Sequence, residues 1–408
     1  MSRSVKVLFY AILFLLLIGA PIYSFAQTAI YRAAIRIQDQ ELPFGIELKT
    51  LGGKEVIIIH NAEEQIVIDE LKSVGDSLFA RLPIFDSEIH VKQIGKDSLS
   101  GYWYNYSKGK THTFAAKAVS ALDFSRFKGN GNVAKDLSGR WEADFSPNSN
   151  DSSKAIGVFT QTGNHIQGTF LTPTGDYRFL EGSIYNDTLS LSCFDGSHAF
   201  LFKAIYQSDG LLKGTFWSGA SWNEPWVAKR NNNYELPDPE KLTYLKPGYE
   251  KISFTFPDLN KQPVSLADSR FRNKVVIVQI MGSWCPNCMD ESAFFADFYK
   301  KNKDKGIEII GLAYERTKDI DKAITNVNRL KQRYGIEYPL LIAGFSDKVE
   351  AAKTLPMLNH IMSFPTTLII DREGKVRKIH TGYSGPATGK YYQRFVEEFT
   401  LFIDTLIK

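Results

Sequence analysis

Cysteine is scarce in this chain, with 3 residues among 408. Cys285 and Cys288 stand three positions apart, and Cys193 lies far upstream of them. So few cysteines exclude the disulfide framework that holds many small secreted domains together. Cys193 falls on the same alternation face as Leu189 and Leu191, which predicts a buried, inert thiol. The spaced pair is therefore the part of the cysteine content that carries chemistry.

Ligands for a metal ion are also lacking. A structural zinc site takes about four ligands, mostly Cys and His, and no histidine lies within sixty residues of the Cys285/Cys288 pair. His165 and His198 have no partners at ligand spacing. We therefore predict no metal site and interpret the pair as redox-active.

The chain has no large excess of either charge, since it contains 49 Lys and Arg and 45 Asp and Glu, which gives a net charge of +4. This balance excludes the strongly basic surface that binds nucleic acid or an anionic membrane. The length of the chain predicts two or three domains.

A long apolar run is present at the N-terminus. Two basic residues precede an apolar run over residues 7–18, and Pro21 and the small residues of 24–26 follow it. This order is typical of a secretory signal peptide, which we predict over residues 1–26. A retained membrane anchor is the alternative, because the apolar segment approaches the roughly 20 residues that span a bilayer.

Residues 29–230 have almost no helical periodicity and many short alternating runs, which predicts an all-β region. Similar segments recur at a spacing of about 110 residues, which indicates two related antiparallel units, each a barrel or a sandwich. We name them β unit 1 (29–130) and β unit 2 (136–230).

β unit 2 has the clearer pattern, and the Gly-x-Trp of its first strand resembles lipocalin-like barrels. Aromatic side chains crowd both units, and we expect them to fill the interior instead of lining a ligand cavity. Eight strands are predicted in β unit 2: 139–145, 155–162, 165–171, 177–184, 188–194, 198–206, 211–218 and 224–229.

The rest of the chain changes character. Residues 231–247 are polar and carry prolines, which predicts a semi-rigid linker. Residues 248–408 alternate apolar strands with helical patterns, which predicts an α/β domain.

The cysteine pair stands between a strand and a helix. Residues 275–280 form an apolar, β-branched run typical of a strand buried on both faces. Pro286 suits the first turn of a helix. Cys285 is then expected at the helix N-terminus, where the dipole favours the thiolate. Cys288 lies one turn deeper and can attack a mixed disulfide, so we predict an exposed nucleophile at Cys285 and a buried resolving thiol at Cys288.

Trp284-Cys285-x-x-Cys288 after a strand, with residues 363–371 and the turn at 372–374 downstream, resembles the thioredoxin superfamily. Within it the chain is similar to the exported TlpA/ResA-type disulfide oxidoreductases, over about residues 248–408. The resemblance implies a thioredoxin-like domain, a redox-active Cys285–Cys288 disulfide without another cofactor, and a cis bond before Pro365. It also implies a substrate groove lined by Trp284, Pro286, Phe364 and Pro365.

Glu291 matches a glutamate of this group at the same offset, and the resemblance implies a catalytic role in cysteine ionisation and proton transfer. A solvated helix carboxylate is the alternative. A negative charge close to Cys285 opposes the thiolate and so favours a reductase. Gln279 stands where cytosolic thioredoxins have a buried aspartate, which leaves Glu291 as the proton acceptor. The order Pro286-Asn287 is closer to glutaredoxins, so the direction of electron flow stays open.

The sequence therefore predicts a multidomain protein with an all-β N-terminal region and an α/β thioredoxin-like C-terminal domain. We expect an exported protein-disulfide reductase in the periplasm or cell envelope of a Gram-negative bacterium, with a role in redox homeostasis and antioxidant activity. Its expected partners are protein disulfides and a membrane-embedded thiol reductant. A β protein that binds a ligand or partner and carries a regulatory redox domain is the alternative. A peroxidase is disfavoured, because Gly282 stands where such enzymes have Thr or Ser.

Overall fold

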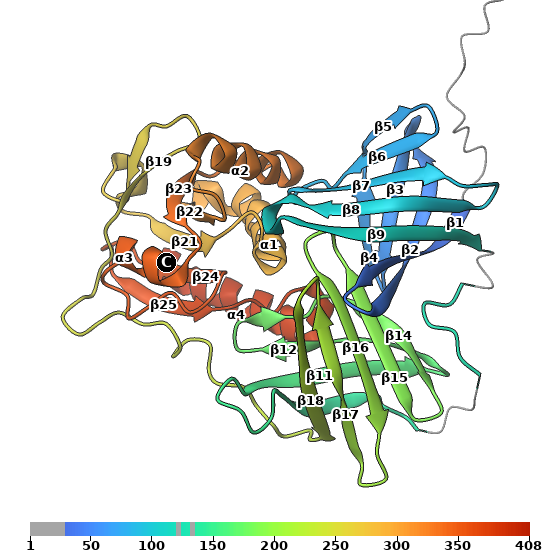
Figure 1. Ribbon diagram of the computed structural model, residues 1–408. Helices are drawn as coiled ribbons and strands as arrows, with labels where there is room; N and C mark the ends of the chain where they lie inside the picture. Colours follow the sequence, from blue (N-terminus) through green and yellow to red (C-terminus); the bar gives the residue numbers. More distant parts are fainter. Residues whose placement is uncertain (1–28, 120–123, 131–134) are drawn as a thin grey trace, which may run out of the picture.

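The computed structural model describes residues 29–119, 124–130 and 135–408. The predicted signal peptide lies outside these residues. Figure 1 shows the thioredoxin-like domain, in yellow to red, beside β unit 1 in blue to cyan and β unit 2 in green. No helix of the described residues is long and apolar enough to cross a membrane.

β unit 1 is one antiparallel nine-stranded sheet in the order β4-β3-β2-β1-β9-β8-β7-β6-β5. Apolar and polar side chains alternate along strands such as β7, so that one face of the sheet is buried. The strands are β1 (Ala29–Ile37), β2 (Gln40–Leu51), β3 (Lys54–Asn61), β4 (Glu64–Ile68), β5 (Glu70–Val74), β6 (Ser77–Arg81), β7 (Ser87–Gln93), β8 (Ser98–Asn105) and β9 (Lys110–Val119).

β unit 2 closes into a barrel, because β10 pairs with both β11 and β18 and β11 pairs with β12. Of the two predicted alternatives, a barrel or a sandwich, β unit 2 thus forms the barrel, and aromatic side chains such as Phe145, Phe170 and Phe202 fill its core. The strands are β10 (Gly139–Phe145), β11 (Ser153–Thr162), β12 (His165–Thr172), β13 (Gly175–Asp176), β14 (Leu180–Tyr185), β15 (Thr188–Phe194), β16 (Ala199–Tyr206), β17 (Leu211–Ser218) and β18 (Trp222–Arg230).

The two β units share a core. Phe194, Ala199 and Leu201 of β unit 2 pack into the buried cluster of β unit 1. Asn61 exchanges two hydrogen bonds with the backbone of Phe194, at 2.9 and 3.1 Å. Between the units, Arg126 is 3% exposed and pairs with Glu181 at 2.6 Å. These contacts hold the two β units together beside the thioredoxin-like domain.

The thioredoxin-like domain has a five-stranded sheet in the order β23-β22-β21-β24-β25. β21 is parallel to β22 and antiparallel to β24, and all seven of its residues are buried. The elements are β19 (Thr255–Pro257), β20 (Pro263–Ser265), β21 (Val275–Met281), α1 (Pro286–Asn302), β22 (Ile307–Glu315), α2 (Ile320–Tyr334), β23 (Leu340–Phe345), α3 (Lys348–Thr354), β24 (Thr366–Ile370), β25 (Val376–Thr381) and α4 (Lys390–Ile407).

Residues 231–247, the predicted linker, are packed against this domain. Thr381 N–H donates to the Pro239 carbonyl at 3.0 Å, and Lys246 N–H donates to the Met357 carbonyl at 2.8 Å. The segment therefore does not act as a free spacer, because its own backbone polar groups are paired with the domain that follows it.

Candidate active site

Cys285 caps the N-terminus of α1. Its Sγ accepts the backbone N–H of Cys288 at 3.2 Å, and Pro286 occupies the first turn as predicted. The same Sγ lies 3.4 Å from the Phe364 carbonyl oxygen. The Phe364–Pro365 bond is cis, as the resemblance implied. The fold thus brings the two cysteines and the cis-proline segment together.

The cysteines differ in burial as expected, but Cys285 is not exposed. Its exposed fraction is 7%, against 0% for Cys288, and all three cysteines are free. The prediction of an exposed Cys285 is therefore wrong in this structure. Ile84 of β unit 1 lies in the same buried cluster as Cys285, and two loops of β unit 2 contact residues next to the site.

The first covering loop, residues 173–178, connects β12 to β14. Ser363 Oγ donates to the Thr174 carbonyl at 3.0 Å, and Asn287 Nδ2 donates to the Asp176 carbonyl at 3.3 Å. Gly382 has a positive φ of 79°, and a Cβ there would lie 2.8 Å from Thr174 backbone, so only glycine fits. This loop fills one side of the predicted substrate groove.

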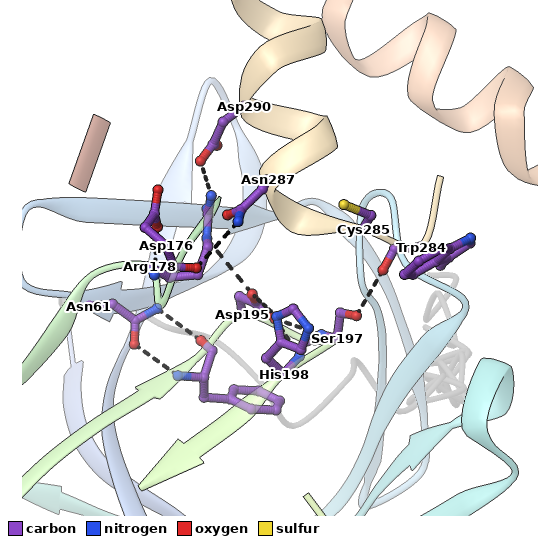
Figure 2. A network of polar contacts seen from close by, with 12 residues as sticks. Asn61, Asp176, Arg178, Asp195, Ser197, His198, Trp284, Cys285, Asn287 and Asp290 are labelled. Atoms are coloured by element: carbon purple, nitrogen blue, oxygen red, sulfur yellow. Dashed lines mark hydrogen bonds and ion pairs between the residues drawn. The ribbon is translucent and has the colours of Figure 1, made fainter. Parts of the chain in front are cut away.

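The second covering loop, residues 195–198, reaches the other side. Ser197 Oγ donates to the Trp284 carbonyl at 3.1 Å, as Figure 2 shows. The Trp284 indole N–H donates to the Tyr314 carbonyl at 2.9 Å, and its ring meets Phe364 edge to face at 5.6 Å. The groove residues are therefore gathered as predicted, yet they lie under β unit 2.

Arg178 forms contacts with both β units and with the thioredoxin-like domain. This buried side chain, 6% exposed, pairs with Glu64 of β unit 1 and with Asp290 of α1, and its Nε lies 3.8 Å from Asp195 Oδ2 in β unit 2. Figure 2 shows Arg178 of the first covering loop between Asp290 of α1 and Asp195 of the second covering loop. Loss of the arginine would leave buried carboxylates without a cation, which is costly.

Glu291 lies in the interior behind the cysteines and is 0% exposed, so the alternative of a solvated carboxylate is wrong. Its carboxylate accepts hydrogen bonds from Gln279 Nε2 at 2.9 Å and Thr367 Oγ1 at 2.8 Å. Burial raises the pKa of Glu291 to about 8, although both hydrogen bonds lower it. The carboxyl group is therefore mostly protonated at neutral pH.

Cys288 shares this interior. Burial, the hydrogen bond with Cys285 and the charges of Cys285 and Glu291 all raise the pKa of the Cys288 thiol well above its ordinary value. Gln279 Nε2 also lies 3.4 Å from the Cys288 carbonyl, which links the helix turn to Glu291. Deprotonation of Cys288 therefore needs a nearby acceptor.

Sequence reasoning missed the covering loops. Arg178 stands 112 residues before Asp290, and Ser197 stands 87 residues before Trp284. His198, which has no partner at ligand spacing, contacts Asp195 at 3.3 Å in the structure. Cys193 is buried, and burial raises the pKa of its thiol well above the ordinary value, as expected of an inert residue.

Comparisons with known proteins agree with this geometry. Residues 247–379 match the AhpC/TSA family. The thiol-disulfide oxidoreductase ResA of Bacillus anthracis is 30% identical over 139 residues, which cover 34% of this chain and 70% of the relative. ResA of Bacillus thuringiensis subsp. konkukian is 30% identical over 129 residues, which cover 32% of this chain and 66% of the relative. The chain thus spans just under two thirds of this last relative.

Among solved structures, a thioredoxin-family thiol:disulfide interchange protein from Chlorobium tepidum TLS matches 39% of this chain and 96% of its own, at 21% identity and a TM-score of 0.29. The AhpC/TSA match over residues 247–379 includes the cysteine pair, the cis-proline segment and nearly all of the five-stranded sheet. The chain belongs to the thioredoxin superfamily, with a C-terminal domain of the ResA/TlpA type.

Proposed function

We propose that this protein is an exported thiol-disulfide oxidoreductase that reduces protein disulfides through Cys285 and Cys288. The observation that carries the proposal is the placement of Cys285 Sγ at the α1 N-terminus, 3.2 Å from the Cys288 N–H and 3.4 Å from the carbonyl before cis-Pro365. A thiolate at a helix N-terminus is stabilised by the free N–H groups and the dipole. The couple needs no cofactor beyond its own disulfide.

In the proposed reaction, the Cys285 thiolate attacks one sulfur of a substrate disulfide and forms a mixed disulfide, while the other substrate sulfur leaves and takes up a proton. Cys288 then attacks Cys285 Sγ, releases the second substrate thiol and leaves the Cys285–Cys288 disulfide. Two electrons have passed to the substrate. A dithiol donor, which we propose to be membrane-embedded, must return them.

Glu291 supplies the proton acceptor in this proposal. Its pKa of about 8 lies between the pKa of an ordinary carboxyl group and the raised pKa of the Cys288 thiol. Above pH 8 the ionised carboxylate, which acts electrostatically on the Cys288 thiol, can accept its proton. The resolving step should therefore speed up as pH rises through about 8.

The alternative of a ligand-binding β protein is not favoured by the closed barrel, because aromatic side chains fill its core. The covering loops instead support a role for β unit 2 in deciding which disulfides reach Cys285. Export to the periplasm or envelope rests on the sequence of residues 1–26 alone.

Trapping of mixed disulfides tests the function. We expect Cys288→Ser to accumulate covalent complexes with disulfide substrates, because the resolving thiol is gone. Cys285→Ser should trap none, since both remaining thiols, Cys193 and Cys288, are fully buried. Non-reducing electrophoresis with mass spectrometry gives the answer. The reverse pattern would overturn the assignment, and titration of the couple in glutathione buffers would give the direction of electron flow.

A further inference from the structure

Two basic side chains converge beside Cys285 from different parts of the protein. Lys108, at the end of the short helix η1 (Tyr106–Lys108) of β unit 1, donates from Nζ to the Ser197 carbonyl at 3.1 Å. Ser197 Oγ in turn donates to the carbonyl of Trp284, the residue before Cys285. Arg316, directly after β22, lies over the Trp284 ring with 4.1 Å from its guanidinium carbon to the ring centroid. Arg316 therefore contacts the active-site turn directly, whereas Lys108 reaches it through Ser197.

No ion pair involves either cation within residues 29–119, 124–130 and 135–408. Arg316 Nη1 is buried without a hydrogen-bond partner. Desolvation of its amine, followed by the charge of Arg316, lowers the pKa of Lys108 to about 8, although the residue as a whole is exposed. Burial likewise lowers the pKa of Arg316. Two like charges thus lie close together, and the acidic groups that act on them are Asp195, on Lys108, and Cys285 and Glu315, on Arg316.

The acids closest to this pair have other partners. Asp195 accepts the N–H groups of Ser197 and His198 at 2.8 and 2.6 Å, and it also contacts Arg178. Glu315 accepts the Ser283 N–H at 2.8 Å and the Ser283 hydroxyl at 2.7 Å. His198 lies beside Asp195 in the same loop and adds no negative charge. The Cys285 thiolate is the remaining negative group that acts on Arg316, and its charge is lost when it forms the mixed disulfide, so that a carboxylate of the substrate can then supply the counter-charge.

We propose that Lys108 and Arg316 bind a carboxylate next to the disulfide of the substrate, so that the preferred substrate is a peptide segment with Asp or Glu beside its cysteine. This inference rests on the proposed function and names the substrate class of the same site. Lysine and arginine bind carboxylates through charge-assisted hydrogen bonds, which strengthen where water is partly excluded. The attraction also raises the rate of encounter with acidic segments.

A merely structural role for Lys108 predicts a different result. If its purpose were to hold the 195–198 loop through the Ser197 carbonyl, a neutral donor would serve as well. Lys108→Gln keeps a donor and removes the charge. Lys108→Arg keeps the charge. The pair of variants therefore separates recognition of an anion from support of a loop.

The experiment uses the reduced full-length protein and three disulfide peptides that differ only in the residue beside the cysteine: Glu, Gln or Lys. We expect the second-order rate constant for the Glu peptide to exceed that for the Lys peptide by about tenfold at low salt. The ratio should shrink as salt is added. Lys108→Gln and Arg316→Gln should each bring the Glu-to-Lys ratio of rate constants closer to one, and Lys108→Arg should preserve the wild-type ratio. Lys110→Gln, which changes an exposed lysine two positions further on, is the matched control and should leave it unchanged.

The outcomes are separable. If the Gln peptide is reduced but wild type does not discriminate between Glu and Lys, the anion site is refuted and the proposed function stands. A preference that survives in both Lys108→Gln and Arg316→Gln also refutes it. If no peptide is reduced, the proposed function fails and the substrate class fails with it. Thermal unfolding of each variant checks that the fold is intact.

Discussion

Arg178 holds the thioredoxin-like domain against the β units, and its removal should uncover Cys285. The perturbation is Arg178→Met in the full chain, which keeps the apolar stem and deletes the charge. Arg178 is 7% exposed at its side chain, and its partners Glu64, Asp195 and Asp290 are exposed by 13%, 1% and 15%. Removing one member of such a buried group costs about 3–5 kcal/mol.

Asp290 is the one of these three acids that belongs to the thioredoxin-like domain. We therefore assign about a third of the cost, about 1–1.7 kcal/mol, to the contact that keeps the domain under the covering loops. Since about 1.4 kcal/mol is a factor of ten in an equilibrium constant, the open population should rise about tenfold. Reagents that reach Cys285 only in the open form should react faster by the same factor.

The assay is alkylation of Cys285 by iodoacetamide in a Cys288→Ser background, followed by mass spectrometry of the peptide. Arg126→Met is the matched control, because Arg126 is equally buried and its hydrogen bonds and ion pair are to the β units. It should destabilise the protein without uncovering Cys285. An unchanged alkylation rate in Arg178→Met, or an equal increase in both variants, would refute the reasoning.

Two further predictions follow from the same structure. Because burial raises the pKa of Glu291 from 4.5 to about 8, the folded state keeps a proton that the unfolded state loses, so stability falls as pH rises across that window. At pH 9, Glu291→Gln should therefore unfold at a higher urea concentration than wild type, with a free energy of unfolding larger by a few kcal/mol at about 1.4 kcal/mol per pKa unit. At pH 4 the two proteins should unfold at similar urea concentrations. The control Glu397→Gln, on the exposed side of α4, should show no such difference between the two pH values. A fragment of residues 231–408, which keeps the segment packed against the domain, should reduce a generic disulfide faster than the full chain, since it lacks the covering loops. A slower or inactive fragment would show that the β units complete the site.

The elements of the fold were readable from local patterns. The apolar run at 275–280 became β21, fully buried, and Pro286 opened α1 as its missing N–H allows. The eight predicted strands of β unit 2 match the closed barrel to within a few residues. Such features depend on side-chain periodicity along a single segment, which a sequence displays directly. The motif around Cys285 is likewise a feature of a single segment and is visible in the sequence.

Other properties were decided by contacts between segments far apart in the chain. The burial of Cys285 depends on Thr174 and Ser197, whose partners lie 189 and 87 residues away. The burial of Glu291, and with it the raised pKa, depends on β24 through Thr367. Nothing in a loop's own composition states which distant surface it will meet.

The sequence by itself determined the redox pair, the α/β domain and the all-β region, because each is written in spacing and periodicity. Only the tertiary structure decided that β unit 2 covers the pair, that Arg178 ties three parts of the protein, and that Lys108 and Arg316 meet beside Trp284. The physical reason is that ion pairs and close packing between domains depend on the docking of whole surfaces, whereas strands and helices form from the residues within them.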